Sequence, residues 1–376
     1  MKIAIVGTFP PYRGGITHFN VTLFRTLQKE HDVKAYNFSV QYPVFLFPGK
    51  TQYEESANKD YDRYPRILNA VNPCNWKKVG RRIGKERPDL VIFKFWMPFF
   101  APAFGSVAKK IKHVSPITKI LVILDNVIPH EPKWWDLPVT KNFFKKVDHF
   151  IAMSNSVRDD LLSIFSDLTI PVVAHPIYDI FGNKIDREVA KSKLGYDQNE
   201  KIILYFGFIR KYKGVDWLIR AIQLLKARWT GFQVIILGES YIDTKPYIEL
   251  VESSGVKDII DMQIRFVPDI EVSEYFCAAD VVVLPYKSAT QSGIAQIAFH
   301  FNRGLVVTDV GGLSEIVPDG KAGLVVDPNP EAIAIGLKAY FTDLNQEDVE
   351  AYIETYKSTF SWEYFCGQLL KTVNDG

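Results

Sequence analysis

A loop of small polar side chains follows one of the buried strands expected in the second half of the chain. Strand residues 281–285 run into the loop 288–293, and a helix-like segment comes next. This order aims free backbone N–H groups at an anion, as in protein phosphate sites. The loop also offers amide and hydroxyl groups that bind sugar hydroxyls. We therefore predict a site for phosphate and sugar, formed by Thr290, Gln291, Ser292 and Gly293.

Two cations lie in a second loop, residues 206–214, between another buried strand and a helix. Arg210 can bind two oxygens of a diphosphate, and Lys213 adds a point charge. A charged surface turn is the alternative interpretation of this loop. We predict that both cations stabilise a diphosphate.

Two loops of the first half also follow buried strands. Gly14 and Gly15 precede a helix and let the backbone approach a ligand. Asp125 and His130 lie in a Pro-rich loop, where a histidine can donate a hydrogen bond or handle a proton near neutral pH. We count both as catalytic candidates. No His, Cys and Asp cluster has metal-ligand spacing, so we expect neither a metal nor a bound cofactor.

These loops require parallel sheets to position them. Near-continuous Val, Ile, Leu and Phe runs indicate strands buried on both faces, which is typical of a parallel sheet covered by helices. Each half of the chain opens with such a strand and then alternates strands with helices. The fold class is therefore α/β, with two Rossmann-like parallel-sheet domains. The expected strands are residues 2–7, 32–38, 90–95, 120–124 and 150–154, and then 201–206, 233–237, 264–267, 281–285, 305–308 and 323–326.

Length and composition agree with this plan. At 376 residues the chain is too long for one ordinary core, and we place the hinge near Pro176. No apolar run is long enough to span a membrane, and the N-terminal residues lack the pattern of a signal peptide. The three cysteines are far apart in the sequence, which fits a reducing cytosol. We expect a cytoplasmic protein.

Charge is unevenly divided along the chain. Residues 1–178 hold 25 Lys and Arg against 15 Asp and Glu, whereas the remainder holds 20 against 28. A basic first half suggests an anionic partner. Residues 75–87 are predicted to form a cationic helix, and residues 95–104 are strongly apolar. Lys and Arg beside Trp suit an anionic membrane surface, but residues 95–104 are also interpreted as core and substrate-pocket wall.

Over nearly its whole length the chain resembles family 4 glycosyltransferases, the retaining enzymes of the GT-B fold that use sugar nucleotides. The resemblance implies an acceptor-binding domain at 1–176, a sugar-nucleotide domain at 177–358, and a terminal helix at 359–376 that crosses back to the first domain. The segments that carry it are PPYRGG (10–15), PHE (129–131), HFIAMSNSVRDDL (149–161), FGFIRKYKGVDWLIRAI (206–222), CAADVVVLPY (277–286) and TDVGGLSEIVPDGKAGLVV (308–326).

The resemblance also implies roles for single residues. Gly14 and Gly15 approach the donor diphosphate, and Arg210 and Lys213 neutralise it. The backbone amides of residues 291–293 hold the phosphate and the transferred sugar. Pro268 and the nearby residues 269–272, with Glu271 among them, resemble the wall that holds the nucleobase.

This chain departs from the family pattern at three places. The two glutamates that the family usually carries eight positions apart are Ala289 and Ile297 here, and Gln291 and Gln296 are the nearest polar substitutes. The family's histidine often falls at the position of Asp125. The family's arginine often follows the strand glycine directly; that place holds Phe208 here, and Arg210 comes two residues later.

The resemblance implies retaining transfer of a sugar from a nucleotide-sugar donor. Because the first half is basic and aromatic, we expect a glycan or a polyprenyl-diphosphate-linked acceptor, in cell-surface polysaccharide synthesis. Such an enzyme would act in the cytoplasm at the inner face of the membrane, without nucleic acid. One alternative is a catalytically weak sugar-nucleotide-binding subunit, because the usual glutamates are missing. The other is a nucleotide-sugar epimerase, which needs carboxylate and histidine groups that the loop 288–293 lacks.

Overall fold

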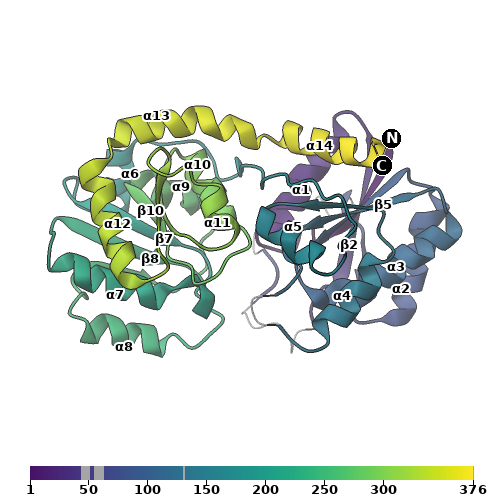
Figure 1. Cartoon of the computed structure of the whole chain (residues 1–376), viewed down its shortest axis with the longest axis horizontal. Helices are drawn as coiled ribbons and strands as arrows, with labels where there is room; N and C mark the ends of the chain where they lie inside the picture. Colours follow the sequence, from purple (N-terminus) through teal and green to yellow (C-terminus); the bar gives the residue numbers. More distant parts are fainter. Residues whose placement is uncertain (44–50, 55–62, 130–131, 376) are drawn as a thin grey trace. The chain divides into compact units, whose positions relative to one another are not determined.

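The structure is a computed structural model that describes residues 1–43, 51–54, 63–129 and 132–375. It divides into two compact domains, Met1–Ala174 with Trp362–Gly376, and His175–Ser361 (Figure 1). The chain therefore passes from one domain to the other directly before Pro176. It returns to the first domain at Trp362, so residues 359–361 of the expected terminal segment lie in the second domain.

The N-terminal domain holds a parallel sheet in the order β3-β2-β1-β4-β5-β6. Helices cover the sheet, as expected for strands that are buried on both faces. The strands are β1 (Lys2–Gly7), β2 (Asp32–Val40), β3 (Arg66–Asn69), β4 (Leu90–Phe95), β5 (Lys119–Leu124) and β6 (His149–Ala152). The helices are α1 (Gly15–Gln28), α2 (Pro73–Lys85), η3 (Pro98–Phe100), α3 (Ala101–Val114), α4 (Asp136–Phe144), α5 (Asn155–Leu162) and α14 (Trp362–Asn374).

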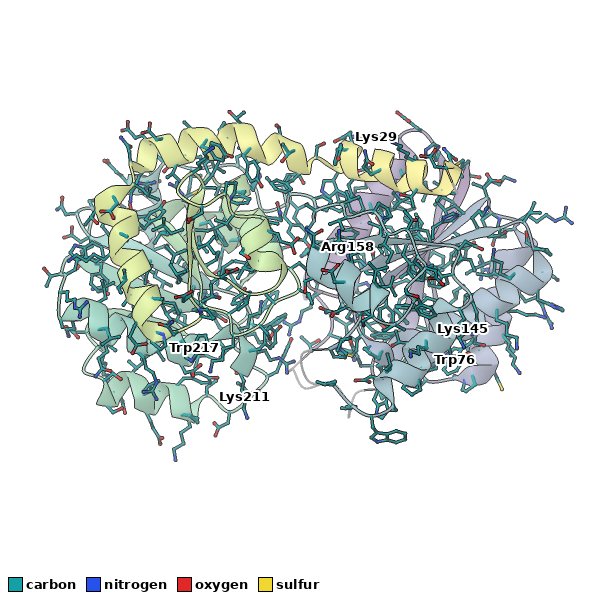
Figure 2. All side chains as sticks on the ribbon, viewed as in Figure 1. Lys29, Trp76, Lys145, Arg158, Lys211 and Trp217 are labelled. Carbon is teal, nitrogen blue, oxygen red and sulfur yellow. The ribbon has the colours of Figure 1, made fainter. Side chains whose placement is uncertain are left out.

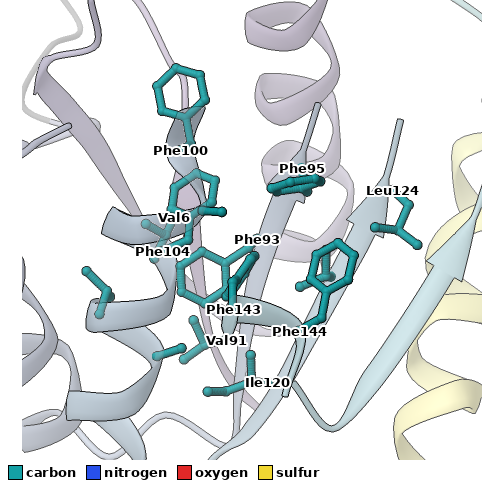
Figure 3. Close-up of a cluster of buried hydrophobic side chains, with 14 of the residues drawn as sticks. Val6, Val91, Phe93, Phe95, Phe100, Phe104, Ile120, Leu124, Phe143 and Phe144 are labelled. Atoms are coloured by element: carbon teal, nitrogen blue, oxygen red, sulfur yellow. The ribbon is translucent and has the colours of Figure 1, made fainter. Parts of the chain in front are cut away.

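One face of this sheet carries an aromatic core (Figure 3). Phe95, Phe100 and Phe104 have no exposed surface, and Phe93 packs edge to face against Phe143. The apolar run 95–104 is therefore mainly core, and Met97 is its exposed exception. The burial of residues 95–104 favours their interpretation as core over their interpretation as a membrane-contacting segment.

The terminal helix α14 packs on the other face of the same sheet. Trp362 and Phe365 contact the ring of Phe19 on α1, and Leu369 has no exposed surface. Because these side chains complete a core that also contains residues of β1, β4 and β5, the end of the chain is an integral part of the first domain.

The C-terminal domain repeats the plan, with a parallel sheet in the order β12-β11-β10-β7-β8-β9. Its strands are β7 (Lys201–Phe206), β8 (Phe232–Leu237), β9 (Ile260–Gln263), β10 (Val281–Leu284), β11 (Leu305–Thr308) and β12 (Gly323–Val326). Its helices are α6 (Arg187–Leu194), η4 (Lys211–Lys213), α7 (Val215–Lys226), α8 (Lys245–Ser253), α9 (Asp269–Ala278), α10 (Gly293–His300), α11 (Gly312–Glu315), α12 (Pro330–Asp343), α13 (Gln346–Tyr356) and η5 (Lys357–Phe360).

The strand predictions were wrong at two edge strands. Residues 264–267 are not a strand, because β9 pairs with β8 earlier, with Ile260 opposite Val234. Ile264 and Phe266 then lie in the following loop, where they are partly exposed. Strand β3 was not predicted at all, since its short sequence RILN has no buried apolar run.

Candidate functional site

The loop after β7 packs against the segment that follows β10. Gly214 ends η4 with φ 69°, a left-handed conformation that favours glycine, and a Cβ atom there would collide with the carbonyl oxygen of Pro285. The backbone N–H of Lys287 donates to the carbonyl of Tyr212 at 2.7 Å. Glycine at 214 is therefore what allows the predicted cationic loop to reach the predicted phosphate loop.

Lys213 is held by aromatic rings rather than by a carboxylate. Its Nζ lies 3.7 Å from the ring centroid of Tyr286 and 5.4 Å from that of Tyr212. Within the described part of the chain, no carboxylate lies at ion-pair distance from this nitrogen. Burial lowers the pKa of Lys213, because the charged form loses hydration. A bound anion would supply the missing compensation.

Arg210, at the start of η4, is half-buried and has a similar environment. The guanidinium carbon lies 5.1 Å from the ring centroid of Tyr241. Among the described residues, no carboxylate forms an ion pair with Arg210. The neighbouring cations behave differently. Lys211 is exposed (Figure 2), and Lys287 forms an ion pair with Asp216 at 2.6 Å. Among the described residues, Arg210 and Lys213 thus lie against aromatic rings, whereas Lys287 is paired with a carboxylate.

The loop before α10 connects to Lys213 through one side chain. The hydroxyl of Tyr286 lies 3.3 Å from Oγ of Ser292, the N-cap residue of α10, and Ser292 makes no capping hydrogen bond to its own helix. Gly293 follows, and a Cβ atom there would lie 3.0 Å from the ring of Tyr178. Thr290 is buried and Gln291 half-buried in the same loop. Tyr286 therefore links Lys213 to the loop that holds Ser292 and Gly293, and the binding of phosphate by these residues stays a prediction.

Gln296 is a buried amide in the first turn of α10. It has no exposed surface, and within the described residues neither its amide oxygen nor its amide nitrogen finds a partner. Buried amides are normally satisfied, so this side chain needs a water molecule or a ligand. Ala289 and Ile297, at the places of the family's glutamates, are buried and apolar.

The predicted nucleobase wall lies at the start of α9, where Pro268 is the N-cap residue. The carboxylate of Glu271 pairs with Arg265 at 2.7 Å, and the same guanidinium donates to the hydroxyl of Tyr275. Glu271 is thus part of a polar network on this edge of the domain. Its contact with a nucleobase stays a prediction.

In the N-terminal domain, α1 begins at the two predicted glycines. Gly14 has φ 105°, and no atom of another described residue, its chain neighbours aside, lies within 4 Å of where its Cβ would be. Its neighbour Gly15 is the first residue of the helix. The helix has no side-chain cap and no acidic residue in its first turn. Negative charge is favourable at this terminus, which is the positive end of the helix dipole.

Asp125 is engaged in a buried ion pair. Its carboxylate lies 2.7 Å from Nζ of Lys94, and both side chains are almost fully buried. The ammonium also lies 3.3 Å from the ring centroid of Phe19. Burial lowers the pKa of Lys94, and Asp125 opposes that shift. A catalytic role for Asp125 stays a prediction, and His130 lies outside the described residues.

Sequence reasoning missed Lys94 and Tyr286. Lys94 is the one charged residue in the buried strand sequence LVIFKF, and that anomaly was a usable signal. Tyr286 follows an apolar strand and had no comparable signal, because tyrosine is common in cores.

Comparisons with known proteins show which proteins this chain resembles. Residues 200–343 match the family described as "Glycosyl transferases group 1". The chain is 29% identical over 222 residues to a D-inositol 3-phosphate glycosyltransferase of Paenarthrobacter aurescens, covering 57% of this chain and 54% of that one. It is also 29% identical over 201 residues to an uncharacterized glycosyltransferase of Methanocaldococcus jannaschii, covering 51% and 50%. The chain thus spans about half the length of the curated relatives that it matches.

Solved structures resemble the whole chain. Anabaena HepE in complex with UDP and glucose has a TM-score of 0.75 at 15% identity, with complete coverage of both chains. Sucrose-phosphate synthase from Thermosynechococcus elongatus has a TM-score of 0.74 at 16% identity and covers 100% of this chain and 99% of its own. The chain shares the GT-B fold of these proteins. Residues 200–343, most of the C-terminal domain, are similar to the glycosyl transferases group 1 family.

Among the described residues, no helix is both long and apolar enough to cross a membrane.

Proposed function

We propose that this protein is a retaining glycosyltransferase of family 4. It moves a sugar from a nucleotide-sugar donor to a glycan or a polyprenyl-diphosphate-linked acceptor, in the synthesis of cell-surface polysaccharide. The observation that carries the proposal is Lys213, a cation held on a tyrosine ring without a carboxylate partner among the described residues. Its position beside the α10 loop supports a diphosphate site. The UDP and glucose complex of HepE supports a nucleotide-sugar donor.

The proposed chemistry is stabilisation of a leaving group. As the bond between the sugar and the diphosphate breaks, negative charge develops on the phosphate oxygens. Lys213 and Arg210 stabilise that charge, and the backbone amides around Ser292 and Gly293 contribute hydrogen bonds. No metal is required, because the two cations supply the positive charge. A phosphate oxygen takes the proton of the acceptor hydroxyl, and the anomeric configuration is retained.

The other predicted residues have supporting roles in this proposal. Gln291 and Gln296 bind hydroxyls of the donor, and Pro268 and Glu271 hold its base. In the N-terminal domain, Gly14 and Gly15 approach the diphosphate. Asp125 and His130 act near the acceptor.

A thermal-shift screen tests the proposal directly. UDP-, GDP- and ADP-sugars are added in turn, and we expect at least one of them to raise the melting temperature. A ligand at 100 times its Kd stabilises the folded state by about 2.7 kcal/mol, which gives a shift of several degrees. Transfer or hydrolysis of that sugar nucleotide is then measured. A screen in which no member changes the melting temperature would contradict the proposal.

A second candidate is a sugar-nucleotide-binding subunit without significant turnover. The buried Ala289 and Ile297 favour it, because neither can bind a sugar hydroxyl. Binding of a sugar nucleotide without any transfer or hydrolysis would select this candidate over the enzyme.

We also propose that the protein works at the cytoplasmic face of the membrane, through a cationic face of the N-terminal domain. Helices α2, α3 and α4 lie side by side (Figure 1), and α2 and α3 contain no acidic residue. Trp134, before α4, is 90% exposed. Exposed basic side chains and an exposed tryptophan on the same domain suit an anionic lipid surface. The cationic face consists of Lys77, Lys78, Arg81, Arg82, Lys85, Lys109 and Lys145, all exposed.

Charge reversal on this face is expected to weaken vesicle binding. The double substitution Lys78→Glu and Arg81→Glu should lower partitioning to phosphatidylglycerol vesicles at least about tenfold at low salt, because each basic residue contributes about 1 kcal/mol near an anionic surface. Co-sedimentation measures the partitioning. The matched control reverses Lys245 and Lys257, exposed lysines of the other domain, and should retain binding. Equal partitioning of all three proteins would discard the cationic face as the contact surface.

A further inference from the structure

Tyr286 lies between the two loops that carry the anion-binding groups of the C-terminal domain. Its side chain is 1% exposed. The face of its ring lies 3.7 Å from Nζ of Lys213, in the loop after β7. Its hydroxyl lies 3.3 Å from Oγ of Ser292, in the loop before α10. One rigid side chain thus contacts both loops.

The backbone on both sides of Tyr286 is also fixed. Its carbonyl oxygen accepts a hydrogen bond from Oγ1 of Thr308, at the end of β11, at 2.6 Å. The next residue, Lys287, donates its N–H to Tyr212 at 2.7 Å. The ring therefore has a defined position relative to three of the parallel strands, β7, β10 and β11.

An aromatic ring holds an ammonium group in a different way from a carboxylate. A carboxylate would fix Lys213 and at the same time cancel its charge. The negative face of a π system attracts the cation while the net charge remains available to another anion. Burial raises the pKa of Tyr286, so its hydroxyl stays protonated and the ring stays neutral.

We propose that Tyr286 is a positioning residue that holds Lys213 toward the donor diphosphate with its charge uncompensated, and that links it to the Ser292 end of α10. This inference rests on the proposed function and names a residue that acts through Lys213 rather than on the substrate. The preference for a diphosphate then depends on two side chains, Tyr286 and Lys213, that are far apart in the sequence.

The test compares diphosphates with nucleosides. Calorimetry gives the Kd of the wild-type protein for UDP, GDP and ADP and for uridine, guanosine and adenosine. The quantity of interest is the preference for the diphosphate over its own nucleoside. Tyr286→Leu removes the ring and is expected to lower this preference about tenfold, whereas Tyr286→Phe keeps the ring face and should stay within about threefold of wild type.

Two comparisons separate positioning from a general structural effect. In a Lys213→Met background, Tyr286→Leu should cause no further loss of diphosphate preference, because the residue through which it acts is absent. Tyr340→Leu is the matched control, since Tyr340 is also 1% exposed and lies on α12 of the same domain. That variant should keep the wild-type preference even if it is less stable.

The outcomes are distinct for this inference and for the proposed function. A folded Tyr286→Leu protein with the wild-type preference would overturn the role of Tyr286 and leave the diphosphate site intact. A wild-type protein that binds diphosphates no better than nucleosides would overturn the site itself. If the leucine variant does not fold, Tyr286→Met makes the same comparison, because methionine fills irregular core volumes.

Discussion

Replacement of Lys213 by methionine is expected to lower kcat/KM for sugar transfer about 100- to 1,000-fold, the usual cost of removing one preorganised donor to developing negative charge. Methionine keeps the length of the side chain and fits the aromatic environment of Tyr286 and Tyr212. The loss therefore reports the charge and not a cavity. Steady-state kinetics with the donor found in the thermal-shift screen measure it.

Lys211→Met is the matched control for this experiment. Lys211 lies two residues earlier in the same 3-10 helix, but it is exposed to solvent. Its substitution removes the same charge from the same loop and should change kcat/KM by less than about threefold, since exposed charges are screened by water and salt. Similar losses for both lysines would indicate a general effect of loop charge and would remove the specific role of Lys213.

Whether Lys213→Met changes kcat or KM provides a second criterion for the role of Lys213. If Lys213 stabilises charge that develops only in the transition state, kcat falls while the Kd for the intact donor changes less. If Lys213 contributes equally to binding of the donor and of the transition state, KM rises and kcat is retained. The first pattern is expected for a cation beside the leaving phosphate.

The sheet architecture was predictable because a buried parallel strand has a strong sequence signature. Strands β1, β4 and β7 are apolar runs with the bounds expected from the sequence. The edge strands β3 and β9 bury less surface and contain polar residues, as in RILN and IDMQ. Hydrophobicity alone does not distinguish such strands from loops, so pairing with a neighbour decides their bounds.

The sequence indicated which loops belong to the candidate site, but it did not indicate the contacts between their side chains. Glycines and cations after buried strands mark places where a chain can meet an anion, and they identified Arg210 and Lys213. The ring that holds Lys213 comes from another strand end, far along the chain. The same applies to Lys94 and Asp125, which meet across neighbouring strands β4 and β5. Contacts of this kind depend on the order of the strands in the sheet, and a single sequence does not specify that order.

The C-terminal domain also contains a buried ionic network whose disruption is expected to be costly. The carboxylate of Asp280, directly before β10, accepts a hydrogen bond from the N–H of Ile202 at 2.8 Å. It also lies 3.2 Å from Nη1 of Arg187 and 3.3 Å from Nζ of Lys191. The side chains of Asp280 and Lys191 are 1% and 4% exposed. This one carboxylate therefore compensates a buried lysine and joins α6 to the sheet.

Asp280→Asn is expected to lower the free energy of unfolding of this domain by about 3–5 kcal/mol, because it leaves Lys191 buried without a compensating charge. Amide hydrogen exchange in β7 and β10 measures the change in the C-terminal domain alone. The control is Glu252→Gln, which breaks an exposed pair with Lys257 and should cost at most about 1 kcal/mol. If both substitutions cost the same small amount, Lys191 must be satisfied by its hydrogen bond to the carbonyl of Glu200, and the network would not be a major source of stability.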